Sequence, residues 1–340
     1  MRLSLRRGSV VSVERPGPAA ELIVEAAGER RPAIAFKSLT GPVEPGDDVV
    51  VNTAAVDLGL GSGGFDLVHV NLTRGLEGTG TEGAHVMKLN YTSLQHAVHP
   101  VEERAPELAD APLAGRAVAV IAVHGQLPCV AWAAAQAQPG ARIGFVQTAG
   151  GALPGELSRT VRELLDGGLL AGHVTAGPAF GGSHEAITVA GGLHAGIAGL
   201  GWDAAVAGPG PGILGSATAL GHGGLAALDS AHAALALGAR PIVVPRMSSG
   251  DPRPRHRDIS HHTITVLQLM LRPVVVALPP DNHATLPGEH EARAGDAALD
   301  GYRASGLPAR TMGRGPEEDE LFFRAALAGG SILGEAIGGV

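Results

Sequence analysis

The sequence predicts an α/β protein: a small all-β domain at the N-terminus, followed by a doubly wound, mainly parallel α/β sandwich. Two observations carry this prediction. Short runs with alternating or β-branched character fill roughly the first 75 residues, with Gly and Pro between them. From Arg116 onward, near-continuous apolar runs alternate with helical stretches, as in a parallel sheet that is covered on both faces.

Length and composition bound the number of domains and the kind of core. The chain has 340 residues, of which 45% are hydrophobic and only 3% aromatic. These values fit about two domains with cores of Ala, Val, Leu and Ile, and they exclude a disordered protein. A polar segment with prolines, Ala105–Leu113, marks the expected boundary. We therefore predict residues 1–105 as a β-rich domain with a crossing linker, and residues 110–340 as the doubly wound α/β domain.

The N-terminal part reads as short strands separated by turn residues, which predicts a small barrel or a sandwich. The runs expected as strands are Gly8–Glu14, Glu21–Glu25, Pro32–Lys37 and Asp48–Asn52. The segment Val56–Phe65 is too rich in glycine for a regular strand, so we expect a loop there.

The remainder alternates between apolar runs and helical stretches. The expected strands are Ala117–Val123, Arg142–Gln147, Leu169–Thr175, Ala186–Val189, Asp203–Ala207, Pro241–Pro245, Pro273–Leu278 and Leu307–Met312. The expected helices are Leu127–Ala137, Glu156–Asp166, Gly191–Gly199, Gly223–Leu237, Thr263–Met270, Glu291–Ala304 and Glu317–Leu327.

Charge and cysteine content limit the classes of function. A formal net charge of −8 gives no general attraction to nucleic acid or to anionic membranes. A single cysteine, Cys129, allows no internal disulfide and indicates a reducing compartment. The most apolar stretch, Ala186–Gly210, is interrupted by His194 and Asp203, so it is not a membrane span. With no signal peptide at the N-terminus, we expect a soluble cytoplasmic protein.

The polar and glycine-rich loops all follow expected strands, and this locates a site. In open α/β sheets, ligands bind beyond the carboxyl ends of the strands. The loops at these ends are His124-Gly125-Gln126, Thr148–Pro154, Ala176–Ser183, Gly208–Ser216, the basic loop Asp251–Thr263 and Asp281-Asn282-His283. We therefore expect them to converge at one edge of the sheet.

The basic loop holds three arginines and three histidines within thirteen residues. Since lysine occurs only at Lys37 and Lys88, arginine clusters reflect a general bias of this chain, whereas histidine clusters do not. The candidate general acids and bases are His124, His256, His261 and His262. The alternative is a solvated loop in which Ser260 caps the following helix.

A divalent metal, Zn or Mn, is a second hypothesis for this loop, with His256, His261 and Asp251 as ligands. His262, Asp258 and His124 are the alternative ligands. Adjacent helical residues point about 100° apart, so His261 and His262 are not expected to share a metal from a helix, although a loop or cap would allow it. No HExxH or cysteine spacing supports a metal site.

An anion pocket is the third hypothesis, with backbone N–H groups of the glycine loops and arginine side chains as donors. The residues expected to bind the ligand are Gly150, Gly151, Ser158, Arg159, Gly208, Gly210, Gly212, Gly215, Ser216, Arg246, Arg255, Arg257 and Lys88. The alternatives are tight turns between closely packed elements for the glycines and a surface position for the lysine. Neither named nucleotide-binding fingerprint is present, and no G-x-S-x-G elbow occurs.

Four motifs together resemble a bacterial family of unknown function, over nearly the whole chain. They are Leu58–Gly64, His85–Leu89, Gly150–Pro154 and Arg255–His262. The resemblance implies no activity, substrate or catalytic residue.

These residues lead to two functional hypotheses. The first is an enzyme that acts on a small anionic or phosphorylated metabolite at the carboxyl edge of the sheet. The second is a non-catalytic ligand-binding or regulatory protein whose β domain binds a partner. We expect no nucleic acid partner and no membrane. The apolar stretch Leu321–Val340 predicts either a homodimer interface or a cover over the protein's own sheet.

Overall fold

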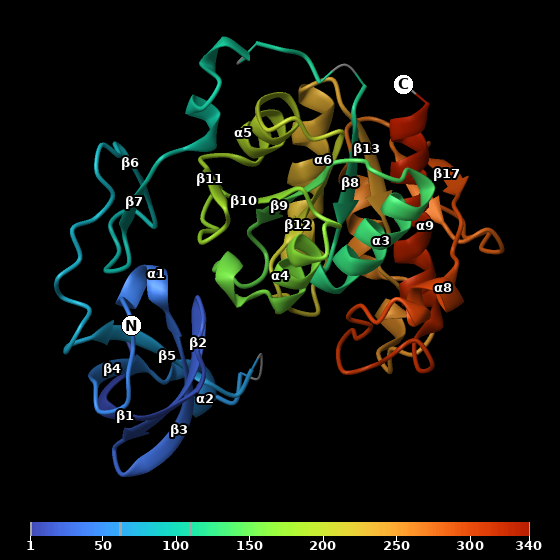
Figure 1. The fold of residues 1–340 in the computed structure, drawn as a ribbon. Helices are drawn as coiled ribbons and strands as arrows, with labels where there is room; N and C mark the ends of the chain where they lie inside the picture. The colour runs from blue at the N-terminus through green and yellow to red at the C-terminus, as the bar shows by residue number, and fades with distance from the viewer. Residues whose placement is uncertain (1, 61–62, 109, 114, 340) are drawn as a thin grey trace. The chain divides into compact units, whose positions relative to one another are not determined.

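The computed structural model describes residues 2–60, 63–108, 110–113 and 115–339, which form two compact units, Met1–His99 and Pro100–Val340. Figure 1 shows an N-terminal unit made mainly of strands and a larger C-terminal unit in which helices surround a sheet. The predicted class, an N-terminal β unit followed by an α/β unit, is confirmed.

The N-terminal unit is a closed five-stranded barrel in the order β1-β2-β3-β5-β4. Its strands are β1 (Leu5–Arg15), β2 (Ala19–Ala26), β3 (Glu29–Phe36), β4 (Asp48–Asn52) and β5 (Asp66–Asn71). Every second residue of β2 is buried, as the period of a half-buried strand requires, and Leu22 and Val24 pack in the barrel core. The strand β5, which the sequence did not predict, closes the barrel by pairing with both β3 and β4. The sandwich alternative is therefore wrong.

Short elements complete this unit. They are α1 (Lys37–Thr40), α2 (Ala54–Asp57) and the antiparallel pair β6 (Val86–Lys88) and β7 (His96–Val98). The segment Val56–Phe65 contains the end of α2 and no strand among its described residues, whereas residues 61–62 lie outside the description.

The C-terminal unit is built on one sheet of eight strands in the order β11-β10-β9-β12-β8-β13-β16-β17, and every neighbouring pair is parallel. The strands are β8 (Ala117–Ile121), β9 (Ile143–Thr148), β10 (Gly172–Ala176), β11 (His184–Ala186), β12 (Ala204–Pro209), β13 (Arg240–Val244), β16 (Val275–Leu278) and β17 (Glu291–Ala294). A separate two-stranded pair is formed by β14 (Met247–Ser248) and β15 (Asp258–Ile259).

Helices cover both faces of the sheet. One face carries α3 (Leu127–Ala137), α4 (Arg159–Asp166), α8 (Leu299–Ala304) and α9 (Glu320–Gly338); the other carries α5 (Val189–His194), α6 (Ala226–Ala236) and α7 (His261–Leu269). Alternate residues of β8 enter the two cores: Ala119 and Ile121 face α3 and α9, whereas Val118 and Val120 face α5 and α6. A strand buried on both faces therefore reads as a continuous apolar run.

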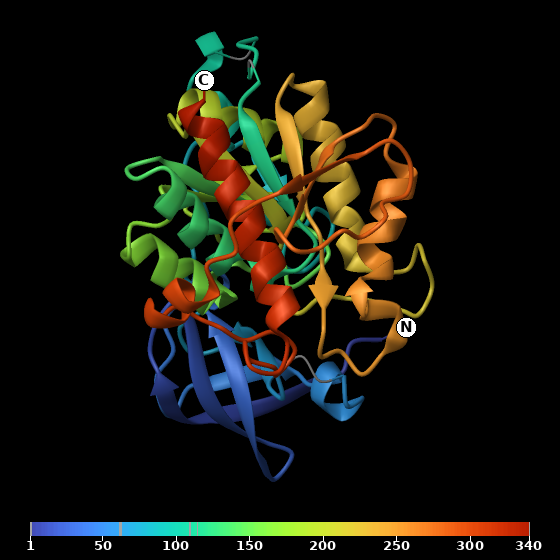
Figure 2. The same cartoon turned by 90° about the vertical axis from the view of Figure 1, so that its right-hand side faces the viewer.

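The helix α9 covers the sheet of its own chain, as Figure 2 shows, which is one of the two expectations for this stretch. A Cβ on Gly330 would lie 2.4 Å from the carbonyl oxygen of Val130, so glycine lets α9 approach α3 closely. By length and composition α9 could cross a membrane, but 67% of its apolar window is buried inside the protein, as in a core helix.

The sequence was wrong at the C-terminal edge of the sheet. Glu291–Ala304 was predicted as one helix, but it forms the edge strand β17 and then the short helix α8. Pairing with β16 outweighs the helical propensity of Glu-Ala-Arg-Ala. Leu307–Met312 was predicted as a strand, but only Thr311 pairs there, in an isolated bridge. The strand predicted at Ala186–Val189 lies earlier in the chain: β11 ends at Ala186, and Thr188 already caps the helix α5.

The strand order places a switch point at the centre of the sheet. From β8 the chain builds outward through β9, β10 and β11, returns to insert β12 beside β8, and then continues on the other side with β13. Because all the strands are parallel, the loops after β8, β12 and β13 leave the same edge next to one another. The candidate residues of the basic loop and His124 therefore belong to one edge, as predicted.

Candidate functional site

The glycines after β9 and β12 pack the loops tightly against one another. A Cβ on Gly151 would lie 2.2 Å from the carbonyl oxygen of Gly210, and a Cβ on Gly150 would lie 2.4 Å from that of Gly223. The amide of Ala152 donates to Pro211, and that of Leu214 donates to Gly150. Close packing thus accounts for Gly150, Gly151 and Gly210, and the anion-binding role predicted for them is not needed to explain them.

The rest of the loop after β12 positions His222, a histidine that was not among the predicted site residues. Gly215 pairs with His222 across an antiparallel bridge, and the amide of Ser216 donates to Gly221. The Ser216 hydroxyl also donates to the Gly221 carbonyl. Gly212 turns the chain with a positive φ of 72°, and Gly208 lies inside β12, where a Cβ would meet Ile121. This loop returns the chain to the sheet edge and buries His222.

The basic loop is folded back on itself by β14 and β15. The Ser260 amide donates to the Arg246 carbonyl, and the Arg246 amide donates to the Thr263 hydroxyl. Ser260 caps α7, because its hydroxyl oxygen accepts from the His262 amide at 3.2 Å. The predicted cap is present, and His261 and His262 are the first two residues of the helix.

Four histidine rings meet at this point. The His222 and His262 rings are stacked, with centroids 3.7 Å apart and an interplanar angle of 10°. His261 lies 4.5 Å from His262 and 5.5 Å from His222, and His256 lies 5.0 Å from His261. We call His222, His256, His261 and His262 the histidine cluster. The expected divergence of His261 and His262 does not separate their rings, because at the first turn both side chains lean back toward the helix N-terminus.

Several ring nitrogens of the histidine cluster are buried without a hydrogen-bond partner among the described residues. They are Nδ1 and Nε2 of His222 and Nε2 of His261. The Ala219 backbone acts on the pKa of His222, but it makes no hydrogen bond of normal geometry with either ring nitrogen. His222 is 6% exposed, His262 4% and His256 1%. Burial lowers the pKa of each of these histidines, to about 3 for His256. The four rings are therefore neutral near pH 7, and buried nitrogens without partners require an explanation.

Arg246 borders the histidine cluster and is 3% exposed. Its Nη1 donates to His262 Nδ1 at 3.3 Å, while its Nη2 lies 3.5 Å from Asp251. Burial lowers its pKa to about 10, so the guanidinium remains charged at neutral pH. The charge of Arg246 is thus poorly balanced, because its contact with Asp251 is long and its other partner, His262, is neutral.

Asp251 is the centre of a buried ion network and is fully buried. It accepts hydrogen bonds from the Arg253 and Arg314 guanidinium groups at 2.8 and 3.3 Å, and Arg314 also binds the buried Asp319 at 3.0 Å. Three guanidinium groups share two carboxylates in this network. Hydrogen bonds from Arg253 are the main reason that the pKa of Asp251 lies below its usual range.

Comparisons with known proteins place the chain among its relatives. A family model described as "Protein of unknown function (DUF3866)" matches residues 32–330. The chain belongs to this family. The resemblance to a family of unknown function that the sequence predicted is thereby confirmed, and its description carries no activity.

No curated protein matches this family member. Among solved structures, the crystal structure of YjeQ from Thermotoga maritima is similar at 16% identity and a TM-score of 0.15, over 50% of this chain. The match spans about half of that chain, 51% of its length. Neither value supports an argument about function, so the case depends on the site itself.

The structure separates the residues predicted to ligate a metal. His256 and His261 lie in the histidine cluster, but the carboxylate of Asp251 is occupied by arginine side chains. His256 Nδ1 is hydrogen-bonded to the Ser260 hydroxyl at 2.7 Å. The side chains whose nitrogens come within 4.8 Å of one another are instead His222, His261 and His262.

His124 lies at the same sheet edge but in a different environment. Its Nδ1 donates to the Pro209 carbonyl at 3.1 Å, so its Nε2 accepts from the Ser158 hydroxyl at 2.7 Å. Ser158 also caps α4, since its hydroxyl oxygen accepts from the Val161 amide. Burial lowers the pKa of His124 to about 4. Both ring nitrogens of His124 are engaged by the chain itself, so the ring links the end of β12 to the start of α4, and its predicted catalytic role stays a prediction.

The other predicted ligand-binding residues are spread out. Arg159 begins α4 and is exposed, and Arg255 is exposed on the basic loop. Arg257 is also exposed, and its Nε donates to the Asp251 carbonyl. Lys88 is a buried residue of β6 in the N-terminal unit, so the prediction that it binds the ligand remains open.

Sequence reasoning missed three residues of the site: His222, Arg314 and Asp319. His222 could have been found, because it lies within glycines in the connection that follows β12. Arg314 and Asp319 lie more than 60 residues beyond Asp251, in a segment with no pattern that links it to the basic loop.

Proposed function

We propose that this protein binds a small phosphorylated or carboxylated metabolite beside the histidine cluster and acts on it as an enzyme. The observation that carries the proposal is the buried Arg246 guanidinium, which has only a 3.5 Å contact with a carboxylate that two other arginines already bind more closely. Three buried or half-buried guanidinium groups against two carboxylates leave one excess positive charge. A bound anion would neutralise it.

The neutral histidines supply the chemistry in this proposal. A neutral imidazole can take or give a proton if its nitrogen is free. His261 is the most exposed ring of the histidine cluster, and its Nε2 has no partner among the described residues. We assign the general acid or base role in the metal-free protein to His261, and the orienting of the neighbouring rings to His256 and His262.

Anion binding is tested by thermal shift and calorimetry with inorganic phosphate, pyrophosphate and citrate, in the presence of a chelator. At a hundred times the dissociation constant, a ligand stabilises the protein by about 2.7 kcal/mol. We expect Arg246→Gln to remove this stabilisation relative to its own ligand-free baseline. The control Arg324→Gln breaks an exposed pair with Asp281 and leaves it intact. No stabilisation of the wild type, or an equal gain in Arg246→Gln, contradicts the proposal.

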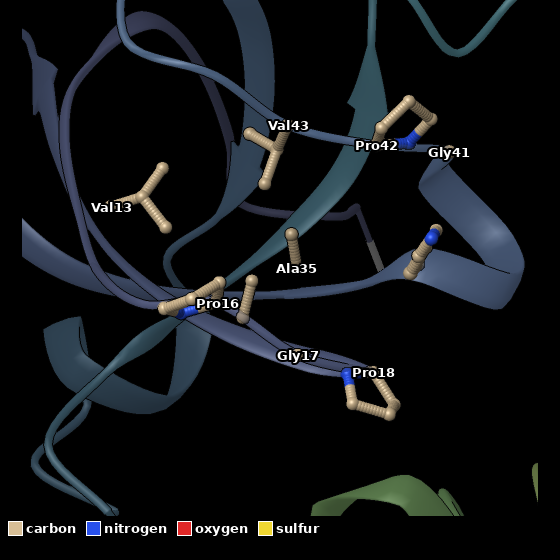
Figure 3. Close-up of a pocket in the computed structure, with 10 residues that line it drawn as sticks. Val13, Pro16, Gly17, Pro18, Ala35, Gly41, Pro42 and Val43 are labelled. Carbon is tan, nitrogen blue, oxygen red and sulfur yellow. The ribbon is translucent and has the colours of Figure 1, made fainter.

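A second function has its own supporting observation. The barrel carries a pocket of about 330 Å³, lined by Val13, Pro16, Gly17, Pro18, Ala20, Ala35, Lys37, Gly41, Pro42 and Val43 (Figure 3). A pocket edged by prolines, with Lys37 in its lining, suits a binding module, as in a regulatory protein whose β domain binds a partner. Anion binding without turnover of phosphorylated or carboxylated compounds would favour this reading, whereas turnover that His261→Asn abolishes without loss of binding favours the enzyme.

The setting is part of the same proposal. We expect a cytoplasmic bacterial protein, because its single cysteine suits a reducing compartment. We also expect no nucleic acid partner and, as an alternative to a monomer, a homodimer. Sedimentation at several protein concentrations measures the oligomeric state.

A further inference from the structure

We infer that His222, His261 and His262 form a binding site for a divalent transition metal, with zinc as the best match, and that the metal holds the anion. The metal site itself does not depend on the proposed function. Only the second claim, that the metal holds the anion, rests on that function. The reasons are the unpartnered nitrogens of His222 and His261, the donor set that the three rings form, and the space beside Gly224.

The first reason is that nitrogens of two of these rings have no hydrogen-bond partner among the described residues. Nδ1 and Nε2 of His222 and Nε2 of His261 are all buried without a hydrogen bond among the described residues. An imidazole that is more than nine-tenths buried, as His222 is, loses its hydrogen bonds to water on folding and normally regains them from protein. A metal ion replaces such a bond with a stronger one.

The second reason is that the donor set suits the ion. The ligating nitrogens of His222, His261 and His262 lie within 4.8 Å of one another. Three imidazoles with one open position are a known arrangement for catalytic zinc, and neutral imidazole is the form that binds. No carboxylate of the ion network is directed at these rings, so a hard ion such as magnesium is a poor match.

The third reason is the space beside Gly224. A Cβ at Gly224 would lie 3.1 Å from His222 Nδ1 and 3.3 Å from His262 Nδ1, so both nitrogens border the same small space. Zinc bonds of 2.0–2.1 Å bring tetrahedral ligands to about 3.4 Å from one another. In stacked rings the in-plane lone pairs cannot converge on one ion. The His222 and His262 rings must therefore rotate relative to one another when the ion binds.

A consequence follows for Arg246. His262 Nδ1 has one lone pair, and it accepts from Arg246 Nη1 at 3.3 Å. If His262 ligates through Nδ1, the metal displaces this hydrogen bond and frees the guanidinium to bind an anion. The ion and an anion at its open position should therefore bind cooperatively, and removal of Arg246 should strengthen the binding of the metal alone.

The test uses the full chain, stripped with a chelator and dialysed. Titration calorimetry with zinc should give one equivalent per chain, and cobalt should give the visible absorption of a tetrahedral site. We expect His222→Asn and His261→Asn to weaken zinc binding at least a hundredfold, and Arg246→Gln to strengthen it severalfold. The exposed His283→Asn, at the same sheet edge, should change nothing.

Gly224→Ala provides a variant that keeps every ligand. Its methyl group should lower zinc affinity at least tenfold while circular dichroism shows an unchanged fold. Zinc affinity that is equal in the wild type, His222→Asn and Gly224→Ala overturns the inference. Sulfate serves as the anion probe: we expect it to raise zinc affinity in the wild type but not in Arg246→Gln. Zinc binding without this coupling overturns the link between metal and anion, whereas failure of phosphate to bind in chelator overturns only the proposed function.

Discussion

Two groups of buried histidines belong to the same α/β unit, and they differ in what their nitrogens contact. His124 donates to Pro209 and accepts from Ser158, and His173 donates to Gln147 at 3.1 Å. In the histidine cluster, by contrast, both nitrogens of His222 and one of His261 have no partner among the described residues. The first group is explained by the folded chain itself. The second group needs a ligand to account for its burial.

The framework of the histidine cluster should show the largest effect. Asp251→Asn removes a buried negative charge that Arg246, Arg253 and Arg314 share. We expect a loss of about 3–5 kcal/mol in the free energy of unfolding, because three cations are left with one buried carboxylate. Urea denaturation measures it. Asp281→Asn, which breaks an exposed pair with Arg324, is the matched control and should change little; a similar small change in Asp251→Asn would refute the network.

The two groups of histidines can be compared by the same substitution. His124→Leu removes the acceptor of the Ser158 hydroxyl hydrogen and the side-chain donor to the Pro209 carbonyl, and we expect a loss of about 2–4 kcal/mol for the two hydrogen bonds together. His222→Leu removes two nitrogens that have no partner, so we expect little change, or a gain, in metal-free protein. Urea denaturation in chelator distinguishes the two, and equal losses would remove the distinction between the groups.

The sequence predicts part of the fold and part of the candidate site. It predicts the parallel sheet, because strands buried on both faces are continuous apolar runs, and it predicts that His124 and the basic loop share an edge. It does not predict β5 or β17, whose pairing partners decide their structure. It also does not predict that both nitrogens of His124 are hydrogen-bonded or that Arg314 binds Asp251. The partners of His124 lie 34 and 85 residues away in the sequence, and Arg314 lies 63 residues from Asp251.

The paired histidines should make stability depend on pH. Burial lowers the pKa of His173 to about 3, below the ordinary value of 6.5. As the pH falls below 6.5, the unfolded chain binds a proton that the folded chain does not, so stability is present above pH 6.5 and is lost toward pH 3. From pH 7 to pH 5 this residue should account for a loss of about 2 kcal/mol.

The measurement for this prediction is urea denaturation of the wild type and His173→Gln at pH 7, 6 and 5. The loss between pH 7 and pH 5 should be smaller in the variant by the share of one histidine. Parallel pH profiles for the two proteins would show that His173 is protonated in the folded chain.

The smallest effects are expected at two serines that cap helices and bind histidines in the same way. Ser158 caps α4 and lies 2.7 Å from His124 Nε2, and Ser260 caps α7 and lies 2.7 Å from His256 Nδ1. Each Ser→Ala change should cost about 1–2 kcal/mol from the lost cap. Thermal denaturation compares them, and Ser260→Ala should in addition weaken zinc binding, because α7 carries two ligands. An equal effect of Ser158→Ala on zinc affinity would contradict the separation of the two groups.

The central claim is that His222 and His261 keep ring nitrogens without a protein partner because these nitrogens bind a ligand. Nuclear magnetic resonance of the histidine ring nitrogens tests it most directly. Uniformly ¹⁵N-labelled, metal-free protein is titrated with zinc, and single His→Asn variants assign the signals. We predict that the ring nitrogens of His222, His261 and His262 shift at one equivalent while those of His124 and His173 do not move. Unchanged signals from His222, or a shift at His124 of the same size, would contradict the account.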